Sequence, residues 1–194
     1  MTMGKVRLEA FSDGVLAIII TIMVLEMKVP HGTGLVALQP LIPVFLSYVL
    51  SFVYIGIYWN NHQSLDRETA RHVNGPILWA NLHLLFWLSL IPFATGWMGE
   101  NHFAPWPVAL YGVVLLFTGT AYFILTKTLI ARHGNDSILA TSIGGDMKGK
   151  MSLAAYAAAI PLSLAQPWVA CALYVLVAIM WLAPDRRIEQ ALTE

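Results

Sequence analysis

Short polar segments divide the sequence into apolar runs about as long as a lipid bilayer is thick. A transmembrane helix needs about 20 predominantly apolar residues. Residues 7–29, 38–58, 76–97 and 105–129 each supply such a run, and residues 148–165 and 168–183 form a pair of shorter runs broken at Gln166-Pro167. We therefore predict an all-α integral membrane protein with six transmembrane helices, in a single domain covering residues 1–194.

The composition supports lipid as the solvent for most of the chain. Hydrophobic residues make up 58% of it and charged residues 11%, whereas a soluble domain has about 25% charged residues. The 11 basic and 11 acidic residues balance, so net charge gives no support for nucleic-acid binding. Cys171 is the only cysteine, which excludes an intrachain disulfide and a CxxC metal site.

The charges between the runs predict how the spans are oriented. Cytoplasmic loops of membrane proteins carry an excess of Lys and Arg. With six spans and a cytoplasmic amino terminus, ten basic residues fall on the inside and only Lys28 falls outside, so we expect both termini in the cytoplasm. Glu9 and Asp13 in the first run favour a retained span over a signal peptide. The inside residues are Lys5, Arg7, Arg67, Arg71, Lys127, Arg132, Lys148, Lys150, Arg186 and Arg187.

The first run carries an aliphatic line on one side of the predicted helix. With a turn of about 100° per residue, Ile18, Ile22 and Leu25 fall close to one line and Thr21 lies about 60° beside it. A line of this kind usually packs against a neighbouring helix or faces lipid. Spacing alone therefore favours packing, and a pore lining needs further support. The same line also contains Arg7, Phe11 and Gly14.

Asp13 lies nearly on the opposite face of the first helix, with Glu9 one turn below it. An ionised side chain inside a span costs about 2.5–3.5 kcal/mol or more, so it normally faces a partner or water. Two roles stay open for Asp13: pinning helices together through a buried hydrogen-bond network, or taking part directly in ion passage or proton sensing. The candidate donors on its own and neighbouring helices are Ser12, Trp59, Asn60, His62, Asn81 and His83.

The start of the first run resembles the signature of a known channel family. The motif Arg7-x-x-x-Phe11-Ser12-Asp13, followed by Ala17-Ile18 and Thr21, is similar to the opening of the first helix in the endosomal and lysosomal potassium channel family (transmembrane protein 175 type). Prokaryotic members have a single repeat of about this length. The resemblance covers nearly the whole chain and includes Tyr58 to His62, Asn74-Gly75, Leu78-Trp79, Asn81-Leu82 and Ser89 to Phe93.

This resemblance implies a homotetramer in a prokaryotic plasma membrane, with the first helix of each copy lining a central pore. Carried over by motif position, Ile18 forms the constriction, Ile22 and Leu25 form further layers, and Thr21 supplies a hydroxyl. Met23 stands where many members have Leu, and it projects off the pore-facing line. The motif residues Arg7, Phe11, Ser12 and Asp13 would form a structural network, for which we add Trp59, His62, Asn81 and His83 as candidate partners.

The resemblance also implies what the protein binds and conducts. The family replaces a carbonyl filter with a hydrophobic constriction, and this sequence has no Thr-Val-Gly-Tyr-Gly segment. We expect a leak-type channel for K⁺ and other monovalent cations, with a modest preference for K⁺ over Na⁺. Its partners would be further copies of itself and membrane lipid, and no cofactor other than the permeant ions is expected.

Two other classes of function are less well supported, and a structural subunit without transport activity stays open. A secondary transporter for a small cation or solute is the main alternative. It would show inverted repeats and broken helices, and Pro43, Pro92 and Pro161 could break helices, but we find no inverted repeat. An enzyme is not expected, because the six histidines lack His-x-x-x-His or His-Glu-x-x-His spacing and no Gly-x-Ser-x-Gly elbow occurs. His62 and His83 are interpreted as bundle residues rather than metal ligands.

Overall fold

The structure, a computed structural model, describes residues 5–68, 75–133 and 147–182, and within these ranges it contains helices and no strand. Three polar parts of the sequence lie wholly or mostly outside the described residues: the segment 66–74, the Gly-rich segment 132–149 and the charged tail 185–194. The elements are α1 (Lys5–Leu25), the 3-10 helix η1 (Leu35–Leu41), α2 (Ile42–Glu68), α3 (Gly75–Ser89), α4 (Ile91–Glu100), α5 (Pro105–His133), α7 (Met147–Ala165) and α8 (Pro167–Leu182).

Four segments of the described chain are long and apolar enough to cross a membrane: Val6–Leu25, Leu35–His62, Gly75–Glu100 and Pro105–Ala131. The helix α8 is apolar but has only 16 residues, and α7 has 19 residues and a lower mean hydropathy than these four spans. The prediction of an all-helical membrane fold is confirmed. Length and composition support four of the six predicted spans.

Two predicted spans have different boundaries in the structure. The second helix continues past its predicted end at Tyr58 as far as Glu68, because the intervening sequence contains no Gly or Pro to end it. The third predicted span, 76–97, is two helices with a break at Leu90. Pro92 has no N–H to bond the carbonyl of Leu88, and its ring would clash with that carbonyl in a continuous helix.

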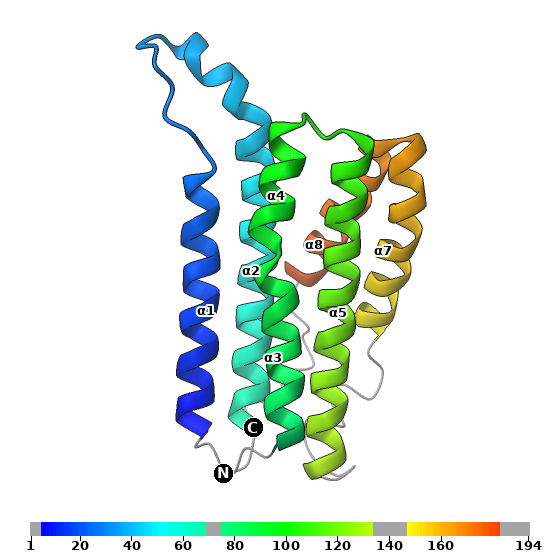
Figure 1. Cartoon of the computed structure of the whole chain (residues 1–194). Helices are drawn as coiled ribbons and strands as arrows, with labels where there is room; N and C mark the ends of the chain where they lie inside the picture. Colours follow the sequence, from blue (N-terminus) through cyan, green and yellow to red (C-terminus); the bar gives the residue numbers. More distant parts are fainter. Residues whose placement is uncertain (1–4, 69–74, 134–146, 183–194) are drawn as a thin grey trace.

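The helices stand side by side, with α1 at one edge of the bundle and α7 at the other (Figure 1). The helices α3 and α4 follow one another end to end in the middle, where α4 packs on α2 and α3 packs on α5. The α7–α8 hairpin covers α5 and also touches α2 through α8. The position of α1 at the edge leaves much of its surface without cover from its own chain.

Buried tyrosines fill the centre between α2, α5, α7 and α8. The hydroxyl of Tyr54 donates to the carbonyl of Tyr174 at 2.7 Å, and the hydroxyl of Tyr174 donates to the carbonyl of Val108 at 3.2 Å. Gly112 permits this packing, because a Cβ there would overlap the hydroxyl of Tyr174. Tyrosine is tolerated in an apolar core when its hydroxyl finds a partner, so these bonds fix how the outer helices fit together.

Small residues allow α2 and α4 to approach closely. A Cβ at Gly99 would lie 2.5 Å from Ser47 Oγ and 2.7 Å from Val44 Cα, so a larger residue could not be placed there without moving one helix. One turn along the same interface, Ser51 Oγ and Thr95 Oγ1 are 2.6 Å apart. Small residues spaced four apart are typical of close helix packing in membranes. The pair α2–α4 therefore forms a tightly joined support for α1.

Candidate functional site

One face of α1 packs on the bundle. Leu8, Ser12, Leu16, Ile19 and Met23 are each at most 5% exposed. Their spacing of three to four residues places them on one side of the helix, which contacts α2, α3 and α4. The remaining sides of α1 carry residues that are exposed or partly exposed in the single chain.

The line of residues assigned to the pore is exposed. Ile18 is 57% exposed, Ile22 43% and Leu25 75%, and we call these three residues the aliphatic stripe. Ile18 lies about 120° around the helix from the middle of the buried face. The fold therefore holds α1 by one side and presents the aliphatic stripe on another.

Thr21 lies beside the aliphatic stripe, and its hydroxyl proton is used in a hydrogen bond to the backbone of α1. Its hydroxyl donates to the carbonyl of Ile18 at 2.9 Å and is 3.1 Å from the carbonyl of Ala17. A hydroxyl has one proton and two lone pairs. With the proton directed at the backbone, the oxygen of Thr21 is left as an acceptor on the exposed surface, which is the character needed to contact a cation.

A buried polar network holds the amino-terminal half of α1. Asn81 Nδ2 donates to Ser12 Oγ at 2.9 Å, and Asn81 Oδ1 lies 2.7 Å from His62 Nε2. Because the amide nitrogen of Asn81 donates to Ser12, its oxygen accepts, and His62 Nε2 must carry the proton. The network joins α1 to α3 and α2, and all three side chains are buried.

Asp13 takes a different partner from its neighbour Ser12. Trp59 Nε1 on α2 donates to Asp13 Oδ1 at 3.1 Å, and both residues are exposed to a larger degree than the network around Asn81. The candidate partners of Asp13 therefore divide into two contacts. Trp59 bonds the carboxylate, while Asn81 and His62 are joined to Ser12.

Three residues assigned to the motif network lie apart from these contacts. Arg7 and Phe11 are on the exposed side of α1, in line with the aliphatic stripe. The ring of His83 accepts a hydrogen bond at Nε2 from Trp87 Nε1 at 3.0 Å. Trp87 in turn stacks on Phe117 of α5 at 4.5 Å between ring centroids. His83 thus belongs to a contact between α3 and α5.

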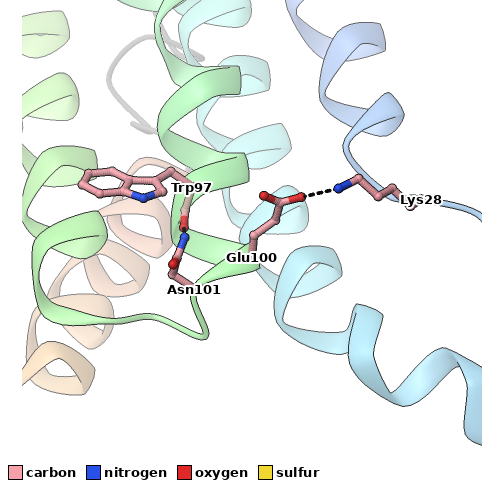
Figure 2. Close-up of polar contacts among 4 residues, drawn as sticks. All are labelled: Lys28, Trp97, Glu100 and Asn101. Carbon is pink, nitrogen blue, oxygen red and sulfur yellow. Dashed lines mark hydrogen bonds and ion pairs between the residues drawn. The ribbon is translucent and has the colours of Figure 1, made fainter.

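The carboxy-terminal end of α1 has a second attachment, to α4. Lys28 Nζ lies 3.0 Å from Glu100 Oε1, as Figure 2 shows. Nearby, the side chain of Glu26 covers Gly96, where a Cβ would lie 3.3 Å from the carboxylate. The end of α4 is itself closed by Asn101 Nδ2, which donates to the carbonyl of Trp97 at 2.8 Å. Both ends of α1 are therefore tied to the bundle by polar groups.

The acidic neighbours of Lys28 affect its protonation. The hydrogen bond and the charge of Glu100 raise the pKa of Lys28 above its ordinary value of 10.5, and Glu26 adds to this effect. The sequence carries only a weak signal for the attachment. Lys28 lies at the end of the first apolar run and Glu100 follows the third, and they have opposite charges. Many other loop charges could form such a pair.

The part of the site that the structure describes contains no cluster of metal-ligating side chains. Among the residues that the structure describes, no group of three or more His, Cys, Asp or Glu lies close enough to hold a metal ion. The exposed side of α1 offers aliphatic side chains and one hydroxyl oxygen at its centre. Such a surface can control the passage of water and ions.

Comparisons with known proteins agree with the motif. A family model described as Endosomal/lysosomal potassium channel TMEM175 matches residues 7–92. This range contains most of α1 and all three residues of the polar network, Ser12, His62 and Asn81. A protein of Chryseobacterium sp. (strain P1-3) named a potassium channel is 55% identical over 192 residues, covering 99% of this chain and 100% of that protein. An endosomal/lysosomal proton channel TMEM175 of Gallus gallus is 43% identical over 75 residues, covering 32% of this chain and 15% of that protein.

A solved structure shows that the fold is shared. The crystal structure of a lysosomal potassium-selective channel TMEM175 homolog from Chamaesiphon minutus matches this chain with a TM-score of 0.78 and 29% identity, covering 91% of this chain and 95% of that one. The proteins matched here are channels by name, and none is an enzyme. The family predicted from the motif is confirmed: the chain belongs to the TMEM175 family of endosomal/lysosomal potassium channels.

Proposed function

We propose that this chain is one subunit of a homotetrameric potassium-permeable channel whose pore is lined by α1. The observation that carries the proposal is the aliphatic stripe, which the chain leaves exposed on a helix fixed to the bundle by another side. A rotation axis beside α1 would bring the stripes of several copies together, as closed symmetric oligomers require. The names of the bacterial relatives support K⁺ as the permeant ion.

The proposed conduction pathway depends on a ring of aliphatic side chains. Ile18 would form the narrowest ring, with Ile22 and Leu25 forming further rings toward the carboxy-terminal end of α1. Such a ring blocks ions by dewetting when it is narrow and lets them pass when it is slightly wider. K⁺ loses hydration water more easily than Na⁺, and the acceptor oxygen of Thr21 can replace part of it. The resulting preference for K⁺ would be modest, and conduction would be of the leak type.

The proposed topology has six spans with both termini in the cytoplasm of a prokaryotic cell, in the plasma membrane. The spans would be α1, η1 with α2, α3 with α4, α5, α7 and α8. The ratio of ten inside basic residues to one outside supports this orientation. The apolar character of α8 supports its insertion despite its length.

Potassium flux from liposomes that contain only the purified protein tests the proposal. Wild type should release K⁺, and Ile18→Asn should release it faster and discriminate less against Na⁺. Val24→Asn is the matched control, because Val24 is 44% exposed on the same helix but lies about 120° from Ile18. Absence of K⁺ flux from both wild type and Ile18→Asn would remove the main support for a channel.

Two further observations call for additional measurements in the same liposomes, namely of proton flux and of coupling to a counter-ion. The Gallus gallus relative is named a proton channel, so a pH-sensitive dye inside the liposomes would show whether protons also pass. The break at Leu90 is a feature that secondary transporters share. Flux that saturates and requires a coupled counter-ion would favour the transporter, whereas a channel passes K⁺ down its gradient without one.

A further inference from the structure

We propose that Met23 and Thr95 position the carboxy-terminal half of α1 and so determine which of its side chains face the pore. The inference rests on the proposed function, because it takes the aliphatic stripe as the pore lining. Met23 is 1% exposed and is the last residue of the buried face of α1. It follows Ile22 directly, so the place where Met23 is held fixes the rotation of Ile22 about the helix axis.

Met23 packs against Thr95, which belongs to a chain of buried, hydrogen-bonded hydroxyl groups. Thr95 Oγ1 on α4 lies 4.0 Å from Met23 Sδ and 2.7 Å from the carbonyl of Ile91. The same oxygen is 2.6 Å from Ser51 Oγ on α2, which is 2.9 Å from the hydroxyl of Tyr111 on α5. Thr95, Ser51 and Tyr111 are buried, so water does not compete for these bonds.

The hydroxyl chain has one consistent direction. A carbonyl only accepts, so Thr95 donates its single proton to Ile91, with the sulfur of Met23 as a second and weaker acceptor. Thr95 must then accept from Ser51, and Ser51 must accept from Tyr111. The rotamer of Thr95 is therefore set by three helices together. Met23 is packed against a side chain that cannot turn without breaking this chain of bonds.

The rest of this half of α1 has no comparable directed contact. Between Asp13 and Glu26, the described side chains that face the bundle are otherwise apolar, Leu16 and Ile19 among them. Apolar burial turns this face toward the bundle, but because it is not directional it tolerates small rotations about the helix axis. Successive residues differ by about 100° around the axis. A rotation by part of that angle would therefore turn Ile22 away from the pore and bring Thr21 or Met23 closer to it.

The permeability ratio of K⁺ to Na⁺ in the full-length protein tests this role. Met23→Ala removes the side chain that packs against Thr95. Thr95→Val keeps the shape of the Thr95 side chain but removes its hydroxyl. Leu16→Ala is the control for the first change, since Leu16 is an equally buried member of the same face. Thr118→Val is the control for the second, since Thr118 is fully buried on α5 and bonds the carbonyl of Val114 at 2.7 Å.

We expect Met23→Ala and Thr95→Val to lower the ratio by about twofold or more, and twofold corresponds to the lower end of the effects that mutations in a packed network have on coupling. Both controls should keep the wild-type ratio. A second measurement, the reactivity of a cysteine on α1, reports the rotation of this helix directly. In a Cys171→Ala background, the reaction of Ile22→Cys with a small polar thiol reagent should change rate severalfold when Met23→Ala is added, while the oligomer keeps its size.

Equal loss of selectivity in all four variants would show a general packing effect and overturn the inference. So would an unchanged ratio in both Met23→Ala and Thr95→Val. If Met23→Ala does not assemble, the result of Thr95→Val alone decides whether the positioning role holds, because valine has nearly the same shape as threonine and should not disturb assembly. The two proposals can fail separately. Wild-type flux with an effect of Ile18→Asn, but none of Thr95→Val, leaves the channel standing and removes only the positioning role.

Discussion

The two ends of α1 are held to the bundle in different ways. At the amino-terminal end, Ser12, Asn81 and His62 are buried and joined by short hydrogen bonds. At the other end, Lys28 and Glu100 form an ion pair in which both side chains are exposed. Water can replace an exposed pair and salt screens it, but water cannot reach a buried network. The strength of the buried attachment should therefore change little with solution conditions, and we call it the buried anchor. The strength of the Lys28–Glu100 pair should depend on salt and pH.

The largest effect is expected where the buried anchor is broken. Asn81→Leu removes both hydrogen bonds that join Ser12 and His62, and leaving buried polar groups with fewer partners costs about 1–3 kcal/mol. Thermal unfolding of the purified protein in detergent measures the loss. Asn101→Ala is the control, because it removes a hydrogen bond of similar length from an exposed position. Equal losses in the two variants would contradict the distinction between buried and exposed attachments.

A smaller effect is expected for the contact next to this anchor. Trp59→Phe keeps most of the ring but removes the hydrogen bond to Asp13, and the partial exposure of both residues limits the cost to about 1 kcal/mol. The same unfolding measurement applies. Trp79→Phe makes the same substitution at an exposed position on α3 and should be nearly neutral. If Trp59→Phe and Trp79→Phe unfold at the same temperature, the hydrogen bond between Trp59 and Asp13 does not contribute measurably to stability.

Reversal of one charge at the carboxy-terminal end should have a weaker effect that depends on salt. Glu100→Lys places two positive charges together, and adding Lys28→Glu restores an opposite pair. At low salt the single variant should unfold at a lower temperature than wild type, and the double variant should recover. In 1 M salt, where the Debye length is about 3 Å, the three proteins should converge. A difference that persists in 1 M salt would mean that the attachment is not electrostatic.

The smallest effect concerns pH. Glu100 raises the pKa of Lys28, so the pair contributes its full stability below the pKa of an unfolded lysine. That contribution is lost as the pH rises through the folded pKa. Wild type should therefore unfold at a higher temperature than Lys28→Met at about pH 8, and the difference should shrink as the pH rises above 10.5, the ordinary pKa of lysine. A constant difference across this range would exclude the charge of Lys28 as its cause.

The overall fold was largely predictable because lipid imposes simple requirements. A backbone in hydrocarbon must satisfy its own hydrogen bonds, so long apolar runs become helices. Pro92 is a possible helix breaker in the sequence, but residues 76–97 are predicted as one span, so the break at Leu90 is not predicted. Proline is frequent in membrane spans, and whether it bends or ends a helix depends on which neighbours satisfy the freed carbonyl. The extension of α2 to Glu68 is not predicted, because the polar residues that follow Tyr58 mark the end of the span and not the end of the helix.

The site was predictable only as a set of residue types. The sequence shows that Asp13 needs a donor, but the choice of Trp59 depends on how far α1 and α2 are shifted along one another. The pairing of Lys28 with Glu100 depends on the same kind of register. Met23 was correctly placed off the aliphatic stripe. The difference from Leu at this position carries little weight for the pore, but facing the bundle is what brings Met23 to Thr95.

The break at Leu90 has a mechanical consequence for α1. Ser12 is attached to α3 on one side of the break, while Met23, Glu26 and Lys28 are attached to α4 on the other. An unbroken third span would transmit any tilt along its whole length. The break interrupts the backbone hydrogen bonds between α3 and α4, and such a break allows two helices to tilt separately. A tilt of α4 alone would move the carboxy-terminal attachments of α1 relative to Ser12. Ile18 and Ile22, which we propose as pore-lining residues, lie between these attachments, so such a tilt would change the spacing of their proposed rings.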